Sequence, residues 1–207
     1  MSKFVPVIAL CGLVSLSASA AEKHLSQVFA YQGEALVLDV GVGEVEIVSA
    51  SDNQFRVDVV VESANSGFLF FSSKKDVSDI ELQSELTKGE RLALKLTDDD
   101  DVKQRWKITL PAEAKVKIDM GVGQITATGL DNSVDIDLGV GEVNVSHSHE
   151  YADISLHSGV GEVSYTVNGT EIDVERAMVS QSYQASARGD GALSVDVGVG
   201  EVEITKL

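Results

Sequence analysis

The chain has 207 residues and is strongly acidic, with 33 aspartate and glutamate residues, 16 lysine and arginine residues and a formal net charge of −17 at pH 7. Such a surface repels nucleic acid and anionic lipid headgroups, so we expect cations or basic molecules as partners and no nucleic acid. The only cysteine is Cys11, so the rest of the chain has no thiol for a disulfide or a nucleophile.

The first 21 residues have the pattern of a secretory signal peptide. Lys3 supplies the positive charge, residues 4–16 form the apolar region, and Ala18-Ser19-Ala20 supplies the small residues of a cleavage site. The apolar region is shorter than the roughly 20 residues that span a bilayer, and no later segment is long enough. The sequence therefore predicts a signal peptide over 1–21 and a mature protein over 22–207, without a membrane span, in the periplasm, on the cell surface or secreted.

A short glycine motif occurs five times in the mature chain. Each copy is Gly-Val-Gly, with an acidic residue or histidine two positions before the first glycine and Glu or Gln directly after the second. The Gly-Val-Gly units begin at residues 41, 121, 139, 159 and 198. The last four are separated by 18, 20 and 39 residues, which indicates one structural unit per roughly 20 residues.

Each motif predicts two strands joined by a corner. The apolar residues Leu38, Val40 and Val42 occupy even positions, whereas Val45 and Ile47 occupy odd ones, so the inward-facing set changes between Val42 and Val45. Glycine suits such a corner because it adopts positive φ and lets neighbouring strands approach closely. The predicted structural corners are Gly41, Gly43, Gly121, Gly123, Gly139, Gly141, Gly159, Gly161, Gly198 and Gly200.

The motif is absent from about residues 49–115, where longer alternating runs occur. Residues 55–61, 80–86, 91–96 and 106–110 alternate as half-buried strands do. Lys88-Gly89-Glu90 predicts a hairpin turn, and the four aspartates of 98–101 predict an exposed loop. Repeated rungs then occupy about 116–207, interrupted at 168–191 by a loop or a degenerate rung.

The fold class that follows is all-β, a single domain over 22–207. Near-constant spacing of the motif favours a β-solenoid-like stack of short strands, in which each rung adds about 4.8 Å along the axis. A β-sandwich is the alternative. It accounts for the strands between 55 and 110 but gives no reason for a corner motif to recur five times.

The run from Trp106 through Pro111 to Gly123 resembles a known bacterial family. It has a strand that ends in proline, then a short strand, then serial glycine corners, and in this it is similar to the exported domain called DUF4097, or "putative adhesin". The resemblance covers most of the mature chain. It implies a β-solenoid-like envelope or surface protein and brings no catalytic residues with it.

Stacking in register would place acidic residues in rows. One row would contain Glu44, Gln124, Glu142, Glu162 and Glu201, and a second would contain four aspartates interrupted by His157. Carboxylate oxygens in such a row are possible Ca²⁺ ligands. The alternative is a solvated surface, with Gln124 and His157 relieving the repulsion between like charges.

Three histidines offer a second possible metal site. His147 and His149 are two residues apart, hence on one face of a strand, and His157 follows ten residues later. Such a set could bind Zn²⁺ or Cu²⁺. The alternative is a polar loop after Val145 without bound metal.

These observations lead to an exported cell-envelope protein with a structural or adhesin-like interaction role, no catalytic activity and a protein or glycan partner. A divalent-metal-binding envelope protein is the alternative. A polysaccharide-active enzyme is a third hypothesis that rests on fold analogy alone. The final rung, residues 202–204, would leave an exposed strand edge at the end of the stack, which predicts self-association there.

Overall fold

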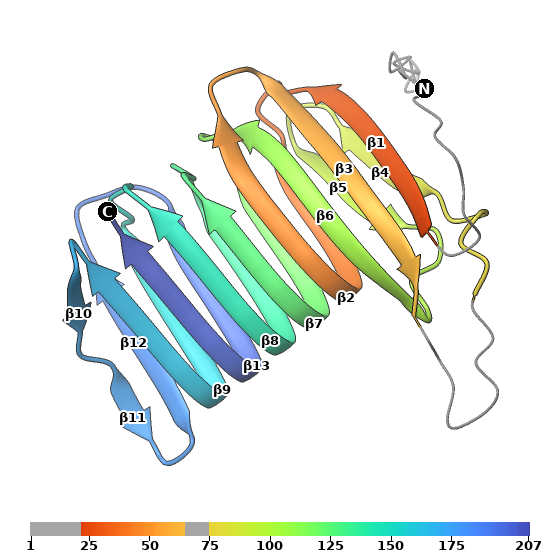
Figure 1. The fold of residues 1–207 in the computed structure, drawn as a ribbon. Coiled ribbons are helices and arrows are strands. Elements are labelled where there is room, and N and C mark those ends of the chain that lie inside the picture. Colours follow the sequence, from red (N-terminus) through yellow and green to blue (C-terminus); the bar gives the residue numbers. More distant parts are fainter. Residues whose placement is uncertain (1–21, 65–74) are drawn as a thin grey trace, which may run out of the picture.

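The structure, a computed structural model, describes residues 22–64 and 75–207. The predicted signal peptide at 1–21 lies outside the described residues. All regular elements in the described ranges are strands (Figure 1). They are β1 (Glu22–Ala30), β2 (Ala35–Ala50), β3 (Gln54–Ser63), β4 (Leu82–Thr87), β5 (Arg91–Leu96), β6 (Val102–Pro111), β7 (Val116–Thr128), β8 (Val134–His147), β9 (Asp153–Val167), β10 (Thr170–Ile172), β11 (Glu175–Ala177), β12 (Ser180–Ser186) and β13 (Ala192–Lys206).

The five glycine motifs lie in the middle of five long strands, β2, β7, β8, β9 and β13. We call the half of each strand before Gly-Val-Gly the first arm and the half after it the second arm. In β2 the buried set is Leu36, Leu38 and Val40 on the first arm and Val45 and Ile47 on the second. The predicted change of the inward-facing set at the corner is therefore confirmed.

The valine inside the corner is a correction to that pattern. Val42 was expected to continue the buried set of the first arm, but its side chain is 40% exposed. The reason is that the chain has already begun to turn at Gly41, so Val42 stands on the outside of the bend between two glycines.

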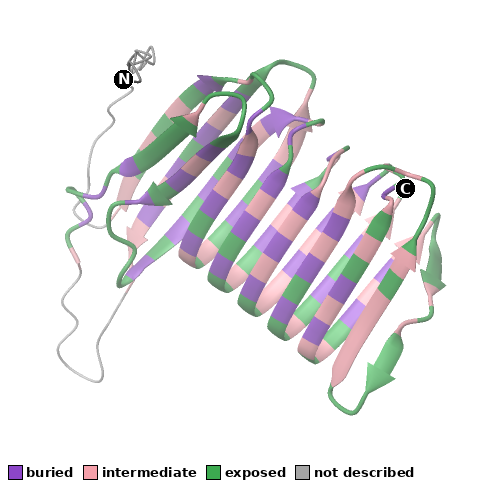
Figure 2. Ribbon diagram, turned by 180° about the vertical axis from the view of Figure 1, so that it is seen from behind, coloured by how far each residue is buried: buried purple, intermediate pink, exposed green. Residues whose placement is uncertain are grey.

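The five strands stack in parallel and in register. Their order in space is β2, β7, β8, β13, β9, and equivalent residues of the motif are direct neighbours throughout. Figure 2 shows the result as buried bands that alternate with intermediate or exposed ones along the stacked strands. The predicted solenoid-like stack of bent strands is thus present.

The last strand is not at the end of the stack. β13 pairs with β8 on one side and with β9 on the other, so the C-terminal rung lies between two rungs that precede it in sequence (Figure 1). The prediction of self-association through an exposed edge at 202–204 is therefore wrong, because both edges of that segment are already hydrogen-bonded. The segment 148–152 joins β8 to β9 across the position that β13 fills.

Beyond β2, the two layers of the stack are continued by separate strands that pair with one arm each. β5 pairs with the first arm of β2, and β6 pairs with its second arm, so together they form a rung whose corner is replaced by the loop 97–101. The predicted hairpin at 88–90 is confirmed, since β4 pairs antiparallel with β5. β3 and then β1 continue the second arm beyond β6. Strands 55–110 therefore extend the stack as two facing layers, which is where the sandwich-like pattern comes from.

The segment 168–191 covers the other end. β12 pairs antiparallel with the first arm of β9, and β10 pairs with the end of its second arm. Between them, Gly161 N donates to Val179 O at 3.1 Å and Val163 N donates to the side-chain oxygen of Gln181 at 3.0 Å. The backbone of the outermost rung, β9, therefore has hydrogen-bond partners along most of its length.

Apolar side chains, mostly aliphatic, fill the space between the two layers. They form one continuous core that includes residues from Phe29 to Ile204. Within the described part of the chain there is no helix with the length and apolar character needed to cross a membrane.

Candidate functional site

In every rung, the second glycine of Gly-Val-Gly cannot be replaced by a residue with a side chain. Gly141 has φ +145°, and a Cβ atom there would lie 1.8 Å from the carbonyl oxygen of Gly123 in the neighbouring rung. Gly123 and Gly200 have the same relationship to Gly43 and Gly141. A side chain at this position would push two rungs apart, so the motif keeps the backbones of adjacent corners in direct contact.

The predicted glutamate row is present on the outside of the second arm. In spatial order it runs Glu44, Gln124, Glu142, Glu201, Glu162. Because β13 lies between β8 and β9, Glu201 has a glutamate on each side. These three consecutive carboxylates are the densest part of the row.

The aspartate row lies on the outside of the first arm, in the order Asp39, Asp119, Asp137, Asp196, His157. Lys117 Nζ contacts Asp135 at 2.8 Å and Asp137 at 3.1 Å. Its hydrogen bonds to these two carboxylates raise the pKa of Lys117 above its ordinary value. The lysine therefore remains charged and partly neutralises this part of the row.

The two interruptions of the rows contact the acidic residues beside them. Gln124 Nε2 donates to Glu142 at 3.4 Å, and Asn144 Nδ2 donates to the other oxygen of the same carboxylate at 2.9 Å. His157 Nδ1 lies 3.2 Å from Asp196 Oδ2. The expectation that Gln124 and His157 relieve repulsion is supported by these contacts.

Sequence reasoning missed the row of valines that lies between the two acidic rows. We call it the valine ridge; its members in spatial order are Val42, Val122, Val140, Val199 and Val160, with exposures of 40, 45, 46, 46 and 48%. The signal was in the motif itself, because a valine with glycine on both sides has no neighbouring side chain to cover it. The ridge is apolar and exposed on all five rungs.

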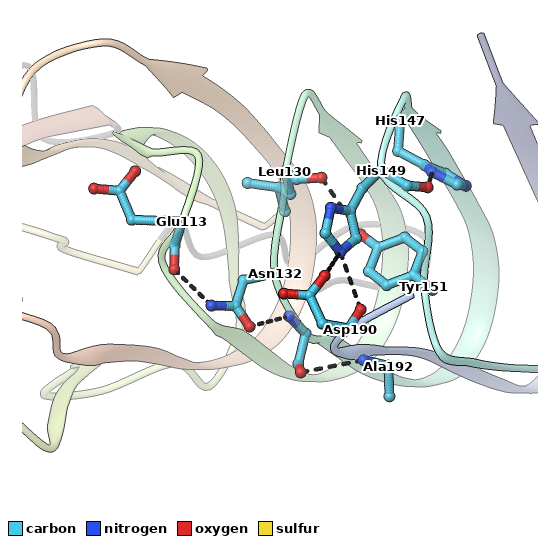
Figure 3. Close-up of polar contacts among 9 residues, drawn as sticks. Glu113, Leu130, Asn132, His147, His149, Tyr151, Asp190 and Ala192 are labelled. Atoms are coloured by element: carbon cyan, nitrogen blue, oxygen red, sulfur yellow. Dashed lines mark hydrogen bonds and ion pairs between the residues drawn. The ribbon is translucent and has the colours of Figure 1, made fainter. Parts of the chain in front are cut away.

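His147, the last residue of β8, and His149, in the connection 148–152, lie beside Tyr151 (Figure 3). The ring of Tyr151 makes edge contacts with both, at centroid distances of 4.9 Å to His147 and 4.8 Å to His149. His147 is 1% exposed, its Nδ1 lies 3.0 Å from His149 O, and its Nε2 has no hydrogen-bond partner among the described residues. Burial lowers the pKa of His147, so the neutral ring is favoured.

His149 fixes the loop that leads into β13. Its Nε2 lies 3.0 Å from both the backbone oxygen and a carboxylate oxygen of Asp190 (Figure 3). Nearby, Asn132 Nδ2 donates to Glu113 O at 2.9 Å, and Ala192 N donates to Ser133 Oγ at 3.2 Å. These contacts connect the loops of successive rungs, and the two histidines take part in packing those loops.

The three histidines predicted as a metal set are not brought together. His157 lies on the first arm of β9 and contacts Asp196, whereas His147 ends β8 and is in register with Lys206. Within residues 22–64 and 75–207, no three histidine, aspartate or glutamate side chains converge on a point where they could share a metal ion. Metal binding by the glutamate row or the histidines stays a prediction that a titration must test.

Two open grooves lie on either side of the corner of β2. The groove on the first arm, about 480 Å³, is lined by β2, β4 and β5 and includes Asp39 and Lys95. The groove on the second arm, about 510 Å³, is lined by β2, β3, β6 and β7 and includes Glu44, Arg105 and Lys107. Both have mixed charge and border the acidic rows.

Comparisons with known proteins give a likeness in fold. No protein-family model matches the sequence, so none confirms membership of DUF4097. No curated protein matches it either. Among solved structures, a protein from Clostridium sporogenes described as a "putative cell adhesion protein" is similar with a TM-score of 0.50 and 14% identity, over 89% of this chain and 100% of the other. A "putative adhesin" from Bacteroides fragilis gives a TM-score of 0.25 at 9% identity, over 91% and 100% of the two chains.

Proposed function

We propose that this protein is exported and acts in the cell envelope as a non-catalytic, adhesin-like interaction protein. The observation that carries the proposal is the outer surface of the corner, where five rungs present the same exposed valine and acidic positions in register. A repeated, solvent-facing surface suits binding to an extended partner, because each rung adds an equivalent contact.

The fold likeness supports this proposal. The protein from Clostridium sporogenes is described as a "putative cell adhesion protein", and its whole length corresponds to 89% of this chain. The resemblance to the DUF4097 family points the same way. The predicted signal peptide adds a route out of the cytoplasm.

The polar groups near the corner support a role in binding. The carboxylates of the two rows are spread along the outside of the stack, and His147 and His149 are used in packing the loops around Tyr151. Hydrolysis by acyl transfer needs a nucleophile, a base and an oxyanion site in mutual contact, whereas glycoside hydrolysis needs two suitably spaced carboxyl groups. In this proposal the carboxylate rows act as repeated contact points for a partner.

The proposal is tested by binding of labelled mature protein, residues 22–207, to intact bacterial cells. Saturable binding that survives washing is expected, and competition by excess unlabelled protein distinguishes it from non-specific adsorption. Cells treated with protease or with periodate identify a protein or a glycan as the receptor. Absence of saturable binding, or turnover of cell-wall polysaccharide that one carboxylate variant abolishes, would contradict the proposal.

A further inference from the structure

The valine ridge is an exposed apolar line within a polar exterior. Along the second arm, the outward positions that follow the ridge in β8 are Glu142, Asn144 and Ser146, and the other rungs carry comparable polar residues. At a rung spacing of about 4.8 Å, five valines form a line about 19 Å long. An apolar line of this length on all five rungs is more than the scattered exposed valine expected on any surface.

The charges beside the ridge are mostly negative, although Lys117 pairs with Asp137 and Arg105 lies beside Glu44. Asp39, Asp119, Asp137 and Asp196 lie on one side, and Glu44, Glu142, Glu201 and Glu162 lie on the other. The loop 98–101 adds aspartates at the β2 end, where an Asp99 carboxylate oxygen lies 2.9 Å from the position of a Cβ on Gly41. A partner for the ridge must therefore bring apolar side chains with positive charges on both sides of them.

This pattern excludes several occupants. A second copy of the chain would place acidic rows opposite acidic rows, and its net charge of −17 would oppose the encounter. Anionic membranes and nucleic acids carry the same sign as the rows. A polypeptide with lysine or arginine beside apolar residues has the complementary chemistry.

The spacing of the rungs bears on the conformation of that polypeptide. Along an extended strand, side chains on one face recur about every 6.8 Å, whereas along an α-helix they recur about every 5.4 Å. The helical repeat lies closer to the rung spacing of about 4.8 Å. A helix lying parallel to the stack could therefore contact successive valines with one apolar side chain per turn.

We infer that the valine ridge and its flanking acidic rows form a docking surface for a basic amphipathic helix of a partner protein. This inference rests on the proposed function as an interaction protein and names the chemistry of one partner. The valines supply the apolar contact, and the two acidic rows fix the orientation of the helix by pairing with basic residues on its two sides.

The experiment compares two peptides in binding to the mature protein in 150 mM NaCl, by fluorescence anisotropy. The first is an 18-residue helix-forming peptide with leucine once per turn, flanked by lysines, and the second is oligolysine of equal charge. We expect the amphipathic peptide to bind at least tenfold more tightly. Equal binding of the two would overturn the inference, since charge alone would then account for it, as would failure of the amphipathic peptide to bind.

Two sets of variants assign the binding to the ridge. V122T/V140T/V199T keeps β-branched side chains of the same shape, and it is expected to weaken the amphipathic peptide at least tenfold while changing oligolysine binding less than twofold. The control V28T makes the same change at a valine on β1 that is 52% exposed and lies away from the ridge. Equal losses in the two sets would overturn the inference.

A second group of variants tests whether the carboxylates of the glutamate row contribute to peptide binding. E142Q/E162Q/E201Q is expected to weaken both peptides, whereas E90Q/E113Q/E171Q, at exposed positions in two turns and on β10, away from the corner, is expected to weaken neither. Circular dichroism and melting temperature verify that each variant is folded. If cells bind the protein but neither peptide set depends on the ridge, the docking surface is wrong and the proposed function stands; if cells do not bind it, the proposed function fails whatever the peptides do.

Discussion

The carbonyl oxygen of Gly123 lies 1.8 Å from the point where a Cβ atom on Gly141 would be. This relationship predicts that G141A is strongly destabilising, because even a methyl group would separate two rungs. We expect a fall in melting temperature of more than about 10 °C. Thermal unfolding followed by circular dichroism measures it.

The control for that variant is G89A, at the β4–β5 turn. Gly89 also has positive φ, +72°, but no atom of the described residues lies within 4 Å of a Cβ placed there. Only the backbone strain remains, about 1–2 kcal/mol, which corresponds to a few degrees. Equal losses at the two positions would contradict direct contact between the corners.

Val140 and Val143 provide a second test, because they are three residues apart on β8 and differ in burial. Val143 is fully buried and Val140 is 46% exposed. V143D should cost more than about 4 kcal/mol by placing a charge in the core, whereas V140D should cost about 1 kcal/mol or less. Chemical denaturation checks both, and a severe V140D would mean that the ridge valine is needed for folding itself.

His147 predicts a dependence of stability on pH. Its pKa is lowered in the folded protein, mainly by burial, so below the unfolded-state value of 6.5 the unfolded chain binds the proton more readily. The stabilisation is complete above pH 6.5 and is lost as the pH falls from there towards the lower folded pKa. Carboxylates titrate mostly below this range, near pH 4.

The measurement is the free energy of unfolding from pH 7.5 to 5.5. We expect it to decrease in the wild type and to be flatter in H147Q, with H24Q, at an exposed histidine, as the matched control. The same slope in H147Q and in the wild type would show that another group is responsible.

Glu201 lies between Glu142 and Glu162, so its charge is repelled from both sides. We expect E201Q to raise the melting temperature by about 1–3 °C at low salt, because exposed charge pairs contribute less than about 1 kcal/mol. An amide already lies beside a carboxylate in this row, because Gln124 of β7 donates a hydrogen bond to Glu142 of β8. The gain should shrink in 0.5 M NaCl through screening, and a gain independent of salt would contradict this origin.

The same variant tests the metal alternative. Melting is measured in EDTA, in millimolar Ca²⁺ and in NaCl of equal ionic strength, with Zn²⁺ as a parallel sample. We expect Ca²⁺ to act no more strongly than matched NaCl. A selective rise with Ca²⁺ that E201Q abolishes would show that the glutamate row binds the ion, and a rise with Zn²⁺ alone would direct attention to the histidines.

β13 supports the rungs on both sides of it, which predicts an unusual response to truncation. Deleting 192–207 removes the pairing with β8 and with β9 together, so β9 and β12 should unfold as well. Hydrogen exchange measures this as lost protection at 153–186. Deleting 22–30, an edge strand whose one partner among the described strands is β3, should leave the C-terminal rungs protected.

Much of the fold could be predicted from local patterns. The alternation in β2 and the recurrence of Gly-Val-Gly at intervals of 18, 20 and 39 residues identified bent strands in register, because burial on one face and contact between glycine corners both follow from the chain's own periodicity. The composition of the acidic rows followed from the same register. The hairpin at Gly89 was predictable because turn geometry is local.

Only the tertiary structure decided the order of the rungs and the face of the ridge. Nothing local distinguishes β13 from a terminal rung, since its motif matches that of β8; in the structure it nevertheless lies between β8 and β9, while the 168–191 segment pairs with the far side of β9. Val42 was expected to be buried because alternation extends to it, but the direction of a side chain at a corner depends on where the backbone turns. The valine ridge was therefore present in the sequence, but its exposure and alignment were decided by long-range packing.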